Sequence, residues 1–109
     1  MAAVERLSML RSKASVEPLV QLLKTEQNDF AKGRLIGAIA EIGDDRAARA
    51  LIDLADTKKR DMLRAILQAL SVIGGERVNE FLDILSMHDA ADVRDMVEDA
   101  RKRLRRRAK

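Results

Sequence analysis

The chain has 109 residues, of which 47% are hydrophobic and 36% are charged, with two aromatic residues, one proline and no cysteine. This length fits a single domain with a normal core, and the composition is typical of a helix-rich protein rather than a sandwich, a barrel or a disordered chain. The lack of cysteine excludes disulfides, thiolate metal sites and a cysteine nucleophile, and a reducing cytoplasm is the expected location. No run approaches the roughly 20 apolar residues of a membrane span, and the N-terminus lacks a secretory signal, so we expect a soluble protein.

The net charge of +3 hides an uneven distribution along the chain. Seven of the 21 basic residues lie between 101 and 109, where there is no acidic residue. The first 100 residues therefore hold 14 basic against 18 acidic residues, a net charge of −4. Such an acidic body argues against a broad nucleic-acid-binding face.

Apolar residues at helical spacing predict a helix over residues 2–10 and a second helix that ends near residue 24. Pro18 favours a start of the second helix near residue 15, because proline suits only the first turn of a helix. The polar run TEQND follows, and Asn28 or Asp29 is placed to cap a third helix. Gly43 follows the last apolar residue of that helix and predicts its end.

The stretch EIGDDRAARALIDL, at 41–54, is echoed by VIGGERVNEFLDIL, at 72–85, so that Gly43 aligns with Gly74. An internal repeat of this length predicts stacked units of secondary structure. In each copy a glycine ends one helix and the next begins within about two residues, so the two helices must be antiparallel. Asp44 or Asp45 is the expected cap of the second helix in the first copy.

A final helix is expected over residues 89–104, where Val93, Val97, Ala100 and Leu104 keep the helical spacing. Arg101 and Arg105 then take the places of an apolar residue and of the turn glycine. This helix therefore looks like a terminal unit with a polar outer face, which a stacked array requires. The predicted fold is an all-α solenoid of about seven helices in one domain, 1–104, followed by a basic tail, 105–109. Its repeats cover about 2–24, 29–56 and 59–87, and the capping helix covers 89–104.

The pattern of EIGDDRAARALIDL, together with SVEPLVQLL and the Val93-Arg94 pair, resembles HEAT-like repeats of the short bacterial and archaeal kind named after phycobilisome lyases. The resemblance spans residues 2–104, although Gly75 and Arg11 depart from the family pattern. It implies antiparallel helix pairs stacked in a right-handed superhelix, with the second helix of each pair lining the concave side. The function that it implies is broad, because the family contains scaffolds, adaptors, lyases and DNA-repair glycosylases.

No catalytic site is expected from the residue types present. His88 is the only histidine in the chain and no cysteine is present to join it, so neither a histidine-based metal cluster nor a cysteine–histidine nucleophile pair can be built within one chain, and we expect it in a solvated loop. Neighbouring aspartates, such as Asp44 with Asp45 and Asp89 with Asp92, are better explained as helix caps than as an acid and base. We therefore expect no enzymatic activity, no cofactor and no metal.

The leading functional hypothesis is a protein-interaction scaffold that binds a partner on the concave face. Aligned repeats place three sets of residues at equivalent exposed positions of that face: Glu17, Arg49 and Glu80; Arg46 and Arg77; Gln21, Asp53 and Ile84. The structural alternative is a solvated surface held by weak ion pairs.

The second hypothesis is a non-specific nucleic-acid-binding accessory that acts through the basic C-terminal end. Its expected contacts are Arg101, Arg103, Arg105, Arg106 and Arg107. The alternative is that these cations only offset the helix dipole and keep the end of the chain solvated. Two further possibilities stay open: self-association through the uncovered side of helix 2–10, and a role as one segment of a longer array or as an accessory to a lyase.

Overall fold

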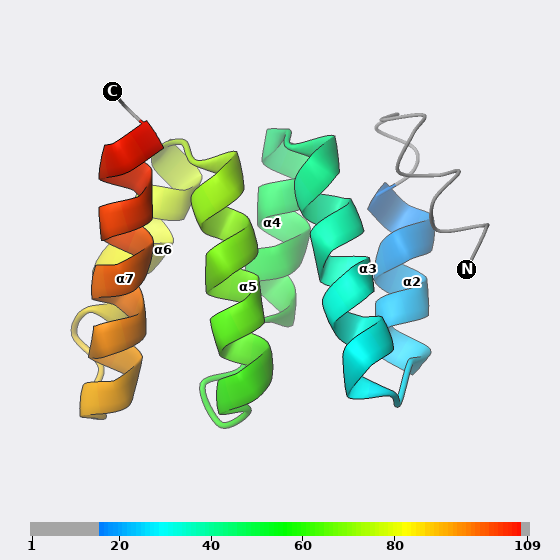
Figure 1. Ribbon diagram of the computed structural model, residues 1–109, viewed down its shortest axis with the longest axis horizontal. Helices are drawn as coiled ribbons and strands as arrows, with labels where there is room; N and C mark the ends of the chain where they lie inside the picture. Colours follow the sequence, from blue (N-terminus) through cyan, green and yellow to red (C-terminus); the bar gives the residue numbers. More distant parts are fainter. Residues whose placement is uncertain (1–15, 108–109) are drawn as a thin grey trace.

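The structure is a computed structural model in which residues 16–107 are described. Within this range the chain forms six α-helices and no strand (Figure 1). The helices are α2 (Val16–Thr25), α3 (Asp29–Ile42), α4 (Asp45–Leu54), α5 (Arg60–Ile73), α6 (Glu76–Leu85) and α7 (Ala91–Arg107). The helix expected over residues 2–10 lies outside the described residues.

The six helices are arranged in two layers (Figure 1). Helices α3, α5 and α7 lie side by side in one layer, which we call the A layer, and α2, α4 and α6 form the other, the B layer. Successive A-layer helices begin at Asp29, Arg60 and Ala91, which are evenly spaced, so the repeat period read from the sequence is confirmed. This stacking of antiparallel helix pairs is an α-solenoid.

The turns between paired helices form as the sequence predicts. Gly43 has a φ of 71°, in the left-handed region that glycine adopts without steric cost, and it ends α3. Asp44 then caps α4, since its side chain accepts a hydrogen bond of 2.9 Å from the backbone N–H of Ala47. Asn28 caps α3 in the same way, at 3.0 Å from the N–H of Ala31.

The inner helices of the A layer, α3 and α5, each have two buried flanks. In α5, the first flank holds Ile66 and Leu70, both fully buried. The second flank holds Leu63, Leu67 and Ser71, which are also buried. This second flank arises because α5 packs against α7 of the following repeat as well as against α3.

The flank of α7 that corresponds to Leu63 and Leu67 is charged. In the alignment of the repeats, the equivalent positions in α7 are Arg94 and Glu98, and both are exposed. Lys102 is the α7 residue equivalent to Ser71, and it is exposed whereas Ser71 is buried. α7 therefore presents a polar outer face, typical of the terminal unit of a helical stack.

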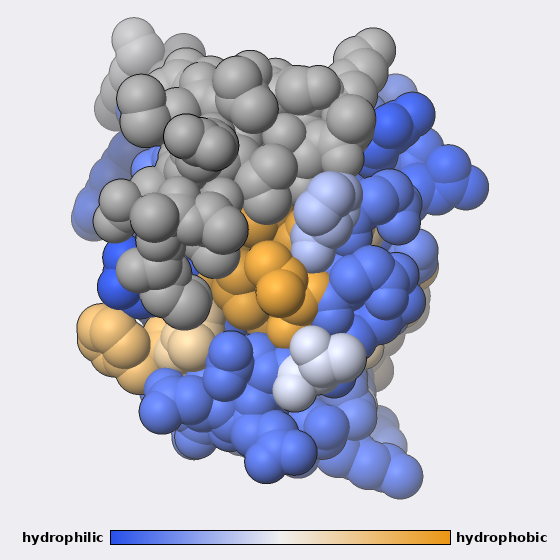
Figure 2. All heavy atoms as spheres, turned by 90° about the vertical axis from the view of Figure 1, so that its right-hand side faces the viewer, coloured by the Kyte–Doolittle hydropathy of each residue, from blue (hydrophilic) through white to orange (hydrophobic). Residues whose placement is uncertain are grey.

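Two apolar residues at the α2–α3 end of the stack are not fully buried. Leu22 in α2 is 43% exposed, and Ala31 in the first turn of α3 is only half-buried. Figure 2 shows the end of the stack formed by α2 and α3, where apolar atoms are bordered below and on the right by polar ones. Phe30 of α3 is also 76% exposed.

Gly37 within α3 and Gly43 directly after it provide a test of the helix and turn conformations. Gly37 lies inside the helix on its exposed side, where an added Cβ would meet no atom within 4 Å. We expect Gly37→Ala to raise the free energy of unfolding by about 0.5–1 kcal/mol, because alanine loses less backbone entropy in a helix. Gly43→Ala should lower it by about 1 kcal/mol, because φ is positive there. Urea denaturation of both variants measures the two changes, and a shift in the same direction for both would contradict this account.

Candidate functional site

A groove on the B layer lies between α2 and α4 and has a volume of about 640 Å³. Its apolar lining comes from Val20 of α2 and from Ala50 and Leu54 of α4. Val20 is buried and the other two are half-buried. A side chain placed in this groove would therefore meet apolar surface at the bottom and water at the opening.

The walls of the groove carry charges of both signs. Four of the residues predicted to bind a partner line it: Glu17, Arg46, Arg49 and Asp53. Lys24 was not among the predicted residues, but it lies near the end of α2 and also lines the groove. It lies two helical turns after Glu17, and this spacing could have predicted that both lie on one side of α2.

The remaining predicted residues lie outside this groove. Gln21 is exposed on α2, and Glu80 and Ile84 are exposed on α6. The burial pattern also shifts the alignment of α2 by one residue. Because Val16, Ala47 and Val78 are equivalent buried positions, the exposed residues that match Arg49 and Asp53 are Pro18 and Leu22 rather than Glu17 and Gln21.

Arg77 on α6 forms a bidentate ion pair with Asp45 on α4. Its Nε donates to one carboxylate oxygen of Asp45 at 2.9 Å and its second guanidinium nitrogen donates to the other at 3.1 Å. This hydrogen bonding lowers the pKa of Asp45 and raises that of Arg77. Asp45, expected as a possible helix cap, thus joins two repeats, and Arg77, expected to bind a partner, is held by the scaffold.

The A layer contains a second ion pair between helices, in which the arginine lies on the earlier helix and the aspartate on the later one. Arg60, the first residue of α5, donates to Asp92, the second residue of α7, at 2.7 Å. The hydrogen bond from Arg60 lowers the pKa of Asp92. Asp92 was expected as a helix cap; instead, it connects α7 to α5 near their N-termini, as Asp45 and Arg77 connect α4 to α6.

The predicted basic residues at the C-terminal end are part of a helix rather than of a tail. The helix expected over 89–104 begins at Ala91 and continues to Arg107. Arg101 forms ion pairs with two carboxylates, that of Asp83 on α6 at 2.7 Å and that of Glu98 at 3.3 Å. Lys102, Arg103, Arg105 and Arg106 are exposed, and the side chain of Arg107 lies outside the described residues.

No metal-binding group of three or more His, Cys, Asp or Glu residues occurs in the part of the chain that the structure describes. His88 lies in the turn before α7, where its Nδ1 accepts a hydrogen bond of 3.0 Å from the backbone N–H of Ala90. It is half-buried rather than fully solvated as expected. Between residues 16 and 107, no helix is long and apolar enough to cross a membrane.

The layered helix pairs, their glycine turns and the regular repeat period define a helical-repeat protein. A scan of family models agrees with this class, since the model of HEAT repeats matches residues 16–108. The chain therefore belongs to the HEAT repeat family. Proteins of this family are typically non-enzymatic and generally mediate protein–protein interactions. A comparison with curated proteins finds no match to the chain.

The pair of Asp45 and Arg77 makes a prediction about pH. The folded-state pKa of Asp45 is below its usual value of 3.8, so the stabilisation by this pair is fully present above about pH 4 and is lost as the pH falls through the lowered pKa. We expect a double-mutant cycle of Asp45→Asn and Arg77→Gln, measured by urea denaturation, to give a favourable coupling at pH 7 that decreases at pH 2.5. A high salt concentration should also weaken the coupling, because the pair is exposed. A coupling that is the same at both pH values would contradict the assignment.

Proposed function

We propose that this protein is a non-enzymatic interaction module that binds a segment of a partner protein in the groove between α2 and α4. The observation that carries the proposal is the combination of an apolar floor with charged walls in one hollow of about 640 Å³. An apolar side chain of the partner would cover Val20 and Leu54, while its charged groups would meet Arg49 and Asp53. Such a mixture of an apolar centre and a polar rim is typical of protein interfaces.

The contacts between helices support the choice of the B layer. A-layer helices make more extensive contacts with one another than B-layer helices do, so the surface between B-layer helices is more open. The hollow between the A-layer helices α5 and α7 is only about 40 Å³. The A-layer hollow between α3 and α5 is larger, about 280 Å³, but it is less than half the volume of the B-layer groove.

The location of charges also favours the groove, rather than the neighbouring face of α6, as the binding site. Arg77 is held by Asp45, so a partner that bound it would have to compete with an existing ion pair. Glu80 and Ile84 on α6 are exposed and would extend the contact if the partner continued past α4. We therefore place the centre of the interface at Arg49 and Asp53 and its edge at Ile84.

Two finer assignments belong to the same proposal. Membership of the short class named after phycobilisome lyases rests on the stretch EIGDDRAARALIDL and its copy. A cytoplasmic location rests on the absence of cysteine from the chain.

Charge reversal in the groove tests the proposed function. Partners are first captured from the source cell on the wild-type chain, purified, and titrated against the chain by calorimetry. We expect the double variant Arg49→Glu and Asp53→Lys, which keeps the net charge, to weaken binding at least 10-fold, because charge pairs at an interface would become repulsive.

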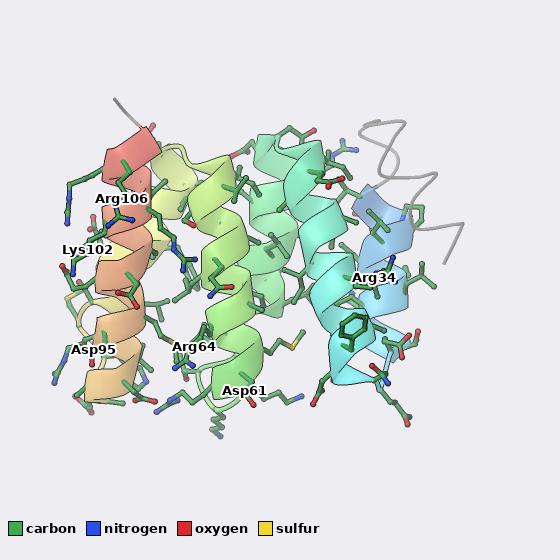
Figure 3. The ribbon with its side chains drawn as sticks, in the orientation of Figure 1. Arg34, Asp61, Arg64, Asp95, Lys102 and Arg106 are labelled. Carbon is green, nitrogen blue, oxygen red and sulfur yellow. The ribbon has the colours of Figure 1, made fainter. Side chains whose placement is uncertain are left out.

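The matched control reverses an exposed pair on the A layer, Asp61→Lys and Arg64→Glu (Figure 3). It should leave the affinity within about twofold of the wild type. Equal binding by the groove variant and the wild type, or an equal loss in the control, would rule out the groove as the binding site. Far-ultraviolet circular dichroism of both variants checks that the helices are intact.

A further inference from the structure

The last turn of α7 has no counterpart in the other A-layer helices. α3 and α5 have 14 residues each and end directly before Gly43 and Gly74, whereas α7 has 17 residues. In the alignment of the repeats, Arg105 occupies the position of the two glycines. The turn of residues 105–107 therefore extends about 4.5 Å past the point where its neighbours stop, at the rise of about 1.5 Å per residue.

Most cations of this helix end are not used by the fold. Arg101 is paired with Asp83 and Glu98. Lys102, Arg103, Arg105 and Arg106 are exposed, and the structure shows no ion pair for these four side chains within residues 16–107. We call these four residues the basic end of α7.

The basic end brings like charges close together, although Glu98 and Asp99 lie four residues before Lys102 and Arg103, at a spacing that favours attraction. Lys102 lies three and four residues before Arg105 and Arg106, and like charges at these spacings repel one another on a helix. Cations do interact favourably with the carbonyl groups at a helix C-terminus, but this effect is limited to the last turn and needs few of them. A polyanion bound at the basic end would remove the repulsion and give these cations the anionic partner that the described residues do not supply.

We propose that the basic end of α7 binds the phosphate backbone of double-stranded nucleic acid without sequence preference. At about 3.6 residues per turn, the four side chains fall within one arc of roughly 160° on the outer side of α7. They can therefore contact successive phosphates along a nucleic-acid backbone. None of the large apolar side chains exposed within residues 16–107 lies on α7, so this helix lacks the apolar face with which an amphipathic helix enters a lipid layer.

The remaining surface of α7 restricts this contact to its C-terminal half. In Figure 3, Lys102 and Arg106 extend from the upper half of α7 and Asp95 from its lower half. Glu98 and Asp99 are also exposed in the lower half, where they would repel phosphate. Neither phenylalanine of the chain lies on α7, so this helix offers no phenylalanine platform for base stacking.

Fluorescence anisotropy of the full chain with a labelled 20-base-pair DNA duplex tests this site. We expect binding of wild type at 50 mM salt, with equal affinity for A·T-rich and G·C-rich duplexes and an affinity about 100-fold lower at 200 mM salt, as expected for about four phosphate contacts. The variant Lys102→Gln, Arg105→Gln and Arg106→Gln should bind at least 10-fold more weakly, and its salt dependence should have a slope smaller by about 2–3.

A control variant separates the site from the net charge. Arg34→Gln, Lys58→Gln and Lys59→Gln removes three exposed cations elsewhere on the protein and should leave the affinity within about threefold of the wild type. An equal loss in both variants, or no binding by the wild type at 50 mM salt, would overturn the proposal. So would binding to vesicles of phosphatidylcholine and phosphatidylserine without binding to the duplex. These results do not depend on Arg49 or Asp53, so they test the basic end separately from the groove.

Discussion

The structure depends on the burial of the inner A-layer helices, α3 and α5, between neighbouring helices. A single pair of helices leaves one flank of its A helix uncovered, and that flank becomes part of the core only when the next repeat packs on it. In α5 this flank contains Leu63 and Leu67, which are as deeply buried as the residues facing the helix's other neighbour. Burial of a leucine contributes roughly 1.5–3 kcal/mol, so these two residues make packing between repeats a substantial part of the stability. The ion pairs Asp45–Arg77 and Arg60–Asp92 lie near helix N-termini and at the surface, so they help to fix the register of the stack rather than supply most of its stability.

The fold was predictable from the sequence because its main determinants are local. Gly43 and Asp44 stand next to each other and specify the end of one helix and the start of the next, and the second copy of the stretch, at 72–85, shows that the arrangement recurs. The second buried flank was not predictable in the same way. Ile36 and Leu67 each directly follow a core residue in the sequence and therefore lie on an adjacent side of the helix. Only the position of the neighbouring repeat decides that they are buried.

The candidate site was predictable in part, for a similar reason. The helical spacing placed Arg49 and Asp53 on one side of α4, and the structure brings both to a groove with Glu17 and Arg46. The role of Arg77 could not be read from its own repeat, because its partner Asp45 belongs to the preceding repeat and lies on another helix. The differences between repeats matter for function because equivalent positions carry different residues: Arg49 lines an open groove, whereas its equivalent Glu80 lies on the exposed face of α6.

The charged outer flank of α7 has a consequence for the length of the stack. Arg94, Glu98 and Lys102 occupy the positions at which α5 buries Leu63, Leu67 and Ser71. A further helix packed on this flank would have to bury three charged groups, which is costly unless each finds a partner. The number of repeats that stack in register is thus controlled by a few side chains on one helix. An engineer who replaced those three residues with the ones found in α5 would turn the end of the stack into a surface on which another repeat could be added.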